Sequence, residues 1–340
     1  MKALMIITLA ILTCSGIQAQ NILPNGGFEN GMVGWANFWG QTGSLSKERF
    51  HAGNASAQVT HTKTAQSGWL QPVSGLEIGA VYRAEVYAFR ETDAITAMVS
   101  MHTASQPYLR SANGEKMRKV GAWELLTVDI ATRPNGEVWV HLCADGAGTI
   151  WFDDATLTLV KTRAQRRAEL LPIVDLPKSS IAEKAQACLD LGEVAFGDGD
   201  LPTAAKYYHQ VLELVPNDRT KCRNALSDLF EMYRRHKDYA QATAAKREIV
   251  ERFSAADTVE GAQDLTGLAE ALGEEADHLP PDYAGAIKRL DEALSLYNKA
   301  GAIYKKIDAV ANKNALDILD DRLVVTRYDI NEDKKLGKLK

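Results

Sequence analysis

Hydrophobic and polar residues alternate along the first half of the chain, and apolar residues recur every three and four positions along the second half. Alternating runs in the first half include YRAEVYAF (82–89), TAMVSMH (96–102), WELLTVDI (123–130) and EVWVHL (137–142). Period-two runs separated by Gly, Pro and Asn are typical of an antiparallel sandwich. The sequence therefore predicts two domains, an all-β jelly-roll sandwich followed by an all-α solenoid of helical hairpins.

The change of pattern also sets the predicted domain boundaries. We expect the sandwich over 20–161, a linker over 162–183, helical repeats over 184–328 and a polar tail over 329–340. The linker carries a charge cluster, two prolines and a pair of serines that can cap the next helix. Its pattern is compatible with a rigid helix and with a hinge.

Three segments of the second half share one apolar spacing, and each precedes a second predicted helix with a small residue where the two helices cross. The segments are LGEVA (191–195), LFEMY (229–233) and LAEAL (268–272), and the small residues are Ala204, Ala242 and Ala286. This pattern resembles the tetratricopeptide repeat, although the later copies are more widely spaced and Lys246 stands where an apolar residue is usual. The resemblance implies a curved surface that binds a protein or peptide partner. The alternative is a spacer or a dimerisation element.

The first residues have the pattern of a secretory signal. Lys2 precedes an apolar run over 3–13, and small residues lead to Ala19. We expect 1–19 to be a signal peptide removed on export, so that the protein is periplasmic, at the cell surface or secreted. The alternative is a lipoprotein anchored at Cys14. No later stretch is apolar for long enough to form a transmembrane helix.

Charge and cysteine content narrow the class of protein further. The net charge of −5 argues against a nucleic-acid partner. Beyond the signal, only Cys143, Cys188 and Cys222 remain, and they lack the paired short spacings of a zinc site or a disulfide framework. We expect Cys188 and Cys222 to be buried thiols on helical faces, with a single disulfide bridge as the alternative.

Four motifs are spread through 21–161 in a fixed order. They are N-G-G-F-E (25–29), H-x-G-x-x-S (51–56), G-x-x-Y (79–82) and F-D-D (152–154). Their succession resembles the carbohydrate-binding modules of families 4, 9, 16 and 22, which have jelly-roll, galactose-binding-like folds. The resemblance implies a domain that binds a polysaccharide or another glycan without cleaving it, and Phe28 and Trp35 are expected in its core.

Modules of this type commonly carry a structural calcium ion. Carried over by position, the ligands would be the side chain of Asp153 and main-chain oxygens of Gly27 and Gly53, with Glu29 joining them. Calcium accepts carboxylates together with backbone carbonyls, and neighbouring acids need such a cation to offset their repulsion. The alternative is that these acids cap turns and pair with nearby Arg or Lys.

Sugars are held by aromatic faces and by planar polar groups. Alternation buries Tyr82, Ala84, Val86 and Ala88 in one strand and Val138, Val140 and Leu142 in another. Two neighbouring strands are therefore predicted to expose aromatic side chains on one binding face, with two tryptophans at its rim. The predicted set is Tyr87, Phe89, Trp139 and His141 on the face, with Trp39 and Trp69 in or beside loops. The alternative for each aromatic is packing in a second layer of core.

Catalysis is not predicted. Paired acids exist, but calcium accounts for the best of them, and the helical half has no nucleophile elbow or metal-spaced His cluster. The sequence thus predicts an exported, non-catalytic adaptor that binds a glycan through the sandwich and a protein through the repeats. Two alternatives stay open: an envelope assembly factor without sugar binding, and an accessory part of a glycoside hydrolase system.

Overall fold

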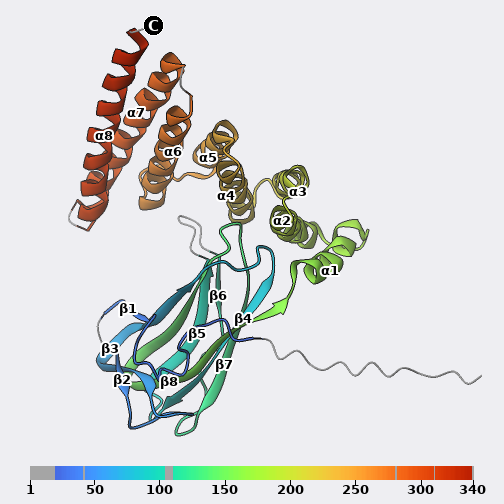
Figure 1. The fold of residues 1–340 in the computed structure, drawn as a ribbon, viewed down its shortest axis with the longest axis vertical. Helices are drawn as coiled ribbons and strands as arrows, with labels where there is room; N and C mark the ends of the chain where they lie inside the picture. Colours follow the sequence, from blue (N-terminus) through green and yellow to red (C-terminus); the bar gives the residue numbers. More distant parts are fainter. Residues whose placement is uncertain (1–19, 41–42, 104–109, 280–281, 310, 339–340) are drawn as a thin grey trace, which may run out of the picture.

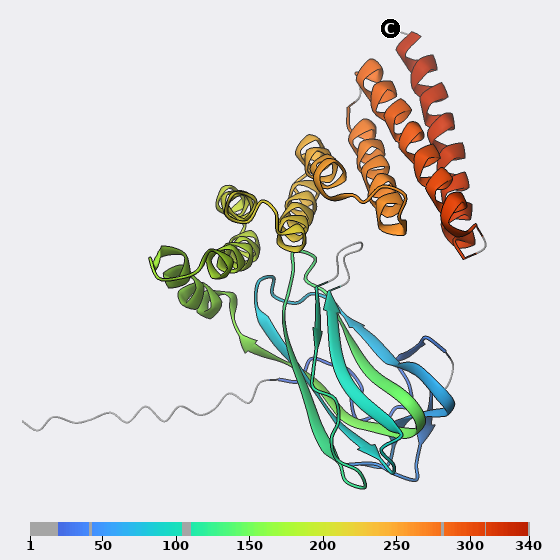
Figure 2. The ribbon, with the colours of Figure 1, turned by 180° about the vertical axis from the view of Figure 1, so that it is seen from behind.

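The computed structural model describes residues 20–40, 43–103, 110–279, 282–309 and 311–338. The predicted signal peptide, with Cys14, lies outside the described residues. Within them the chain forms a β-domain of eight strands followed by eight helices (Figure 1). The helices start over one end of the β-domain and lead away from it, as the view from behind also shows (Figure 2).

The strands form two layers. The strands are β1 (Ala36–Phe38), β2 (Gly43–Ser46), β3 (Ser56–Val73), β4 (Val81–Arg90), β5 (Ile95–Thr103), β6 (Ser111–Asn113), β7 (Glu124–Ala131) and β8 (Val138–Lys161). We call β6-β5-β8-β3-β1 the first layer and β7-β4-β8-β3-β2 the second layer, and every pairing in them is antiparallel. The predicted all-β sandwich is confirmed.

Two long strands belong to both layers. β8 pairs with β5 as far as Gly146 and with β4 from Ile150 onward. β3 follows the same path beside it, with a register shift between His61 and Ala65. Because side chains alternate along a strand, each half of β8 turns one set of residues into the core between the layers and one set outward.

The core of the β-domain consists of the inward sets of both layers. The alternate residues predicted to be buried in β4 and β8 are buried there. They are Tyr82, Ala84, Val86 and Ala88 in β4, and Val138, Val140 and Leu142 in β8. Phe28 and Trp35 pack against each other in this core, with ring centroids 5.3 Å apart, as predicted.

Helices α1 to α7 each follow a residue whose side chain caps a free backbone N–H group. The helices are α1 (Arg163–Asp175), α2 (Ile181–Gly197), α3 (Leu201–Leu214), α4 (Arg219–Arg235), α5 (Tyr239–Phe253), α6 (Val259–Asp277), α7 (Tyr283–Asp308) and α8 (Lys313–Lys338). Ser180 caps α2 in a capping box with Glu183, so one serine of the predicted pair has its predicted role. Aspartates cap α3, α4, α5 and α7.

Consecutive helices pack against each other along the helical domain. At the contact of α2 with α3, a Cβ on Gly192 would lie 2.4 Å from the Tyr208 ring, so only glycine fits there. Ala204, Ala242 and Ala286 are buried, as expected of residues at helix crossings. The assignment to a tetratricopeptide class of repeat stays a prediction.

The structure adds detail at two predicted boundaries. The predicted linker 162–183 contains α1, which starts at a capping box formed by Thr162 and Gln165, so a helix occupies most of the segment that was left open between a rigid helix and a hinge. The predicted polar tail over 329–340 is helical as far as Lys338, because α8 continues through it, and Ile330 is buried against α6 and α7 residues of its apolar cluster, whereas most residues over 331–337 are exposed. The sequence carries a signal for this continuation. Ile330 lies one helical turn after Thr326, so an apolar residue falls on the same helix face.

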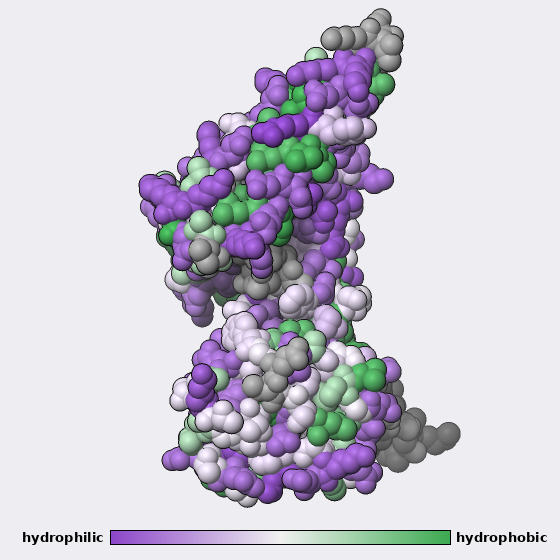
Figure 3. Space-filling view, turned by 90° about the vertical axis from the view of Figure 1, so that its left-hand side faces the viewer, coloured by the Kyte–Doolittle hydropathy of each residue, from purple (hydrophilic) through white to green (hydrophobic). Residues whose placement is uncertain are grey.

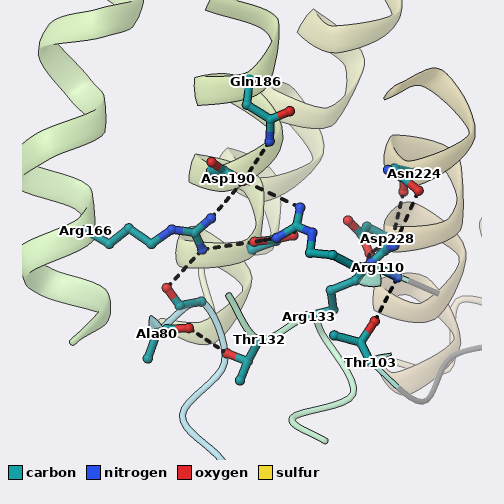
Figure 4. A network of polar contacts seen from close by, with 12 residues as sticks. Ala80, Thr103, Arg110, Thr132, Arg133, Arg166, Gln186, Asp190, Asn224 and Asp228 are labelled. Atoms are coloured by element: carbon teal, nitrogen blue, oxygen red, sulfur yellow. Dashed lines mark hydrogen bonds and ion pairs between the residues drawn. The ribbon is translucent and has the colours of Figure 1, made fainter. Parts of the chain in front are cut away.

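A buried network of arginines and carboxylates joins the two domains (Figure 4). Arg133, which follows β7, donates to Asp228 of α4, and Arg110, which precedes β6, pairs with Glu193 of α2 at 2.7 Å. Arg166 of α1 binds the same Glu193 at 3.0 Å. Figure 3 shows the two lobes and the narrower waist between them. Breaking one member of a buried pair typically costs about 3–5 kcal/mol, so the network holds the lobes in one arrangement.

Two further sequence predictions concern membranes and thiols. Within the described residues, no helix combines the length and the apolar character needed to cross a bilayer. Cys143, Cys188 and Cys222 are free thiols, and Cys188 and Cys222 are buried as predicted.

Candidate functional site

The outer face of the first layer is hollowed into a pocket of about 650 Å³. The pocket is lined mainly by outward side chains of β3, β5 and β8, together with the end of β1 and the segment around β6. These include Phe38, Trp39, Gln66, Leu70, His102, Asn113, Lys116, Trp139, His141 and Asp145. Its size and its mixture of aromatic and polar groups suit a small ligand or a few units of a polymer.

Strand periodicity places the floor of this pocket. Trp139 and His141 lie two residues apart on β8, so both face outward. They pair across the sheet with His102 and Ser100 of β5, which alternate in the same way. The rings of His102 and His141 stack with centroids 4.4 Å apart, and Phe38 meets His141 edge-on at 5.0 Å. The predicted outward direction of Trp139 and His141 is therefore confirmed.

Two tryptophans present accessible rings to the pocket. Trp39 is 75% exposed and directly follows β1, where its backbone adopts a positive φ of 54°. Trp139 is 36% exposed, and its indole N–H donates to Glu137, which fixes the ring. Exposed indole faces beside polar groups are the arrangement that stacks on the C–H surfaces of sugars.

His141 brings a polar group that the protein itself leaves without a partner. Its side chain is buried, and its Nε2 makes no hydrogen bond within the described residues. Burial, with a smaller contribution from neighbouring His102, lowers the pKa of His141 to about 4. The imidazole is therefore neutral at neutral pH, and one ring nitrogen can accept a hydrogen bond while the other donates. Such a group can bind a ligand hydroxyl.

Trp69 is not at the rim of the pocket, contrary to prediction. It lies in β3 opposite Leu142, on the inward side of the first layer, and is only 3% exposed. The physical reason is register: β3 runs continuously past this position, so Trp69 shares the buried side with Gln71 and Val73. The residue that the prediction took for a loop tryptophan belongs to the core.

Tyr87 and Phe89 lie on the outer side of the second layer, where Phe89 is only 6% exposed, so the prediction of a single aromatic face is wrong. They pair with Asp153 and Trp151, in the half of β8 that lies beyond the crossing between layers. There the His51 ring stacks on Tyr87 at 3.7 Å, and the Arg49 guanidinium covers the Phe89 ring at 4.0 Å. Alternation fixed which side of β4 these residues occupy, but it could not show that β8 leaves that layer.

Phe38 and His102 line the pocket but were not predicted from the sequence. A signal for His102 was present, because in TAMVSMH (96–102) the alternation that buries Ala97, Val99 and Met101 turns His102 outward. Phe38 had no such signal, since β1 has only three residues and shows no clear alternation.

The four residues predicted to bind calcium lie around one loop. The Glu29 carboxylate accepts hydrogen bonds from the backbone of Asn54 and Ala55, and Asp153 accepts from His51 and Ala52. Gly53 has a φ of +69°, and a Cβ there would lie 2.1 Å from Glu29 Oε1.

Gly27 lies near Asp154, whose carboxylate pairs with His51 of this loop, since a Cβ on Gly27 would lie 3.7 Å from Asp154 Oδ1. Burial raises the pKa of Asp153, and its three backbone N–H donors act in the opposite direction. Among the described residues no group of three His, Cys, Asp or Glu side chains is placed to hold a metal. Carboxylates and backbone carbonyls are the kinds of oxygen donor that calcium accepts, so the calcium site stays a prediction.

Searches for matching family models and for matching curated proteins found none. Solved structures do match the β-domain. TmCBM61 in complex with β-1,4-galactotriose is 19% identical, with 42% of this chain and 100% of that chain covered and a TM-score of 0.36.

Two further matches are of the same kind. A CBM22-2 xylan-binding domain from Paenibacillus barcinonensis is 18% identical, with coverages of 40% and 98% and a TM-score of 0.33. A family 16 carbohydrate-binding module is 22% identical, with coverages of 41% and 99% and a TM-score of 0.32. These similarities lie in the N-terminal part of the chain and do not extend to the helical domain.

Proposed function

We propose that this protein binds a glycan in the pocket on the first layer and does not cleave it. The observation that carries the proposal is the Nε2 atom of His141, a buried polar group that lines a pocket with two accessible tryptophans. A buried polar atom without a partner is costly, so a ligand hydroxyl that reaches it gains affinity. The motifs that resemble carbohydrate-binding modules support the same class of ligand.

In this proposal the indole faces of Trp39 and Trp139 stack on sugar rings, and the floor supplies hydrogen bonds. Neutral His141 binds one hydroxyl. Asn113 and Gln66 also line the pocket and have amide groups of the kind that reach hydroxyls in pairs. Tyr87 and Phe89 take no part, because they lie on the other layer.

The proposed structural calcium would stabilise the β-domain at a place separate from this pocket. Glu29 and Asp153 would supply carboxylate oxygens, and Gly27 and Gly53 would supply main-chain oxygens. When bound, the ion offsets the repulsion between carboxylates and holds the loop over 51–55 against the start of the domain.

We further propose that the protein is exported by the signal at 1–19 and acts as an adaptor. The helical domain would dock a protein partner while the sandwich holds the glycan. The arginine–carboxylate network supports this role, because a partner on the helices would then be held at a fixed position relative to the sugar.

A gel-retardation screen with the chain from residue 20 tests the glycan proposal. Soluble xylan, galactan, mannan and β-glucan are cast into separate gels, and migration is compared with that in a sugar-free gel. We expect at least one polysaccharide to retard the protein. If none does, the glycan proposal fails and an assembly factor that binds only proteins becomes the better account.

A further inference from the structure

A second cavity, of about 450 Å³, lies between the β-domain and the helical domain. The loop between β7 and β8 lines one side of it, and α4, α5 and α6 line the other. The lining includes Asn135, Arg235, Lys246 and Glu274, together with Gly267. None of these residues lines the proposed sugar pocket.

Lys246 is unusual in this cavity because its side chain is largely buried while its ammonium group, which opens into the cavity, has no acceptor within the described residues. The residue is 8% exposed, and its Nζ lies 4.4 Å from the centre of the Phe230 ring. Within the described residues it makes no hydrogen bond and no ion pair. A buried lysine is rarely left in this condition, since removing an ammonium from water costs more than a ring contact returns.

Four glutamates line the cavity, and three of them are paired with other cations, whereas Glu137 accepts from the Trp139 indole N–H. Glu231 binds Arg235 at 2.7 Å and also Arg234, which reaches Glu274 at 3.6 Å. Glu270 faces Arg322 at 3.4 Å. Burial lowers the pKa of Lys246, and Asp264 and Glu270 oppose this effect from a distance. Within the described residues the ammonium therefore forms no ion pair, whereas Glu231, Glu270 and Glu274 each do.

The space beside Lys246 is open. At Gly267 of α6 a Cβ would lie 3.5 Å from Nζ, so a longer side chain at this position would project toward the ammonium. Asn135 adds a side-chain amide from the β7–β8 loop, whose oxygen accepts from the backbone of Glu137. The amide oxygen is thus occupied, and the NH₂ group of Asn135, like the ammonium of Lys246, is a hydrogen-bond donor.

We propose that this cavity binds a small organic carboxylate, with Lys246 Nζ as the group that donates to its oxygens. A carboxylate carries one negative charge, which matches the single unpaired ammonium. A doubly charged phosphate fits less well, because four glutamates line the same space and would repel it more strongly than a single charge (Glu137, Glu231, Glu270 and Glu274). The carboxylate can come from a free small acid or from the end of a peptide, since both present the same group.

The test measures binding to the chain from residue 20 by calorimetry and by the shift in melting temperature. The ligands are succinate, glutarate and a short acetylated peptide with a free carboxyl end, and succinamide and inorganic phosphate are the controls. We expect at least one carboxylate to bind and to raise the melting temperature, and both controls to bind more weakly. Binding of the acids alone identifies a free acid as the source, and binding of the peptide alone identifies a peptide end.

Three variants locate the site. Lys246→Met removes the charge and keeps a long side chain, and Gly267→Leu fills the space but keeps Lys246. Each should weaken carboxylate binding by about tenfold or more, the loss expected for one hydrogen bond to a charged group. Lys288→Met, at an exposed lysine of α7, should bind like the unmodified chain.

Either of two results overturns the proposal. The first is that no carboxylate binds, or that succinamide or phosphate binds as well as the acids. The second is that Lys246→Met and Gly267→Leu both bind like the unmodified chain. Circular dichroism establishes that each variant is folded, and if Lys246→Met does not fold, Gly267→Leu decides the question.

Discussion

The buried imidazole of His141 links the pocket to the stability of the protein. Burial lowers the pKa of this ring to about 4, whereas in the unfolded chain it is expected near the ordinary value of about 6.5. Between these values the unfolded state binds a proton that the folded state does not. Folding stability contributed by the neutral ring is therefore present above about pH 6.5 and is lost as the pH falls toward 4.

We predict that replacing His141 reduces this acid sensitivity. In urea denaturation, the unmodified chain should lose about 1–3 kcal/mol more than His141→Gln between pH 7 and pH 4.5, after allowance for partial solvent screening. His209→Gln, at an exposed histidine of α3, serves as the matched control and should behave like the unmodified chain. Equal pH profiles for the unmodified chain and His141→Gln would show that the ring is not held neutral by the fold.

At the scale of elements, the loop between β2 and β3 is held by carboxylates from two distant segments. Glu29 precedes β1 and Asp153 lies in β8, yet both accept hydrogen bonds from the backbone over 51–55. A bound calcium ion would tie these segments together and stabilise the β-domain by mass action.

We therefore predict that calcium raises the melting temperature of the β-domain and that a chelator reverses the effect. All six tryptophans precede residue 152, so tryptophan fluorescence follows this domain alone. Asp153→Asn keeps an acceptor for the loop but removes the charge, and its melt should not respond to calcium. Asp145→Asn, an acid of the first layer, should respond like the unmodified chain. Identical melts with and without chelator would remove the ion from the account.

At the scale of the whole molecule, the buried ionic network decides whether the domains unfold together. Asp228 accepts from Arg133 across the domain boundary, and both side chains are almost fully buried. Replacing Asp228 leaves a buried guanidinium without its main counter-charge, which typically costs about 3–5 kcal/mol.

We predict that Asp228→Ala separates the two unfolding transitions. In the unmodified chain, tryptophan fluorescence and far-ultraviolet dichroism, which is dominated by the helices, should change at the same temperature. In Asp228→Ala the two should diverge. Asp129→Ala breaks the solvent-exposed pair with Arg83 and should leave them together. Coincident transitions in Asp228→Ala would mean that other contacts couple the domains.

The sequence predicts features that depend on local periodicity and misses those that depend on how strands cross. Alternation placed Val140 inward and Trp139 outward correctly, and Ser180 was recognised as a helix cap. The position of Tyr87 relative to Trp139 could not be predicted, because it depends on β8 passing from one layer to the other after Gly146. Trp69 was placed in a loop for a related reason. The strand β3 continues past it because of its pairing with neighbouring strands, and the sequence alone does not show how far that pairing extends.

Contacts between domains were also beyond the reach of the sequence. Arg133 lies in an ordinary turn after a strand, and nothing in its neighbourhood indicates a partner on α4, 95 residues away. Lys246 is an intermediate case. Its departure from the apolar pattern was visible in the sequence, but only the structure shows that it lines a cavity.

The central claim is that a glycan binds on the first layer, and calorimetry of paired variants tests it most directly. The polysaccharide that retards the protein is titrated into the unmodified chain, Trp139→Ala and Tyr87→Ala, the last changing an aromatic on the opposite layer. The account predicts that Trp139→Ala weakens binding by about tenfold or more while Tyr87→Ala binds like the unmodified chain. Loss of binding in Tyr87→Ala with full binding in Trp139→Ala would contradict it and place the glycan on the second layer.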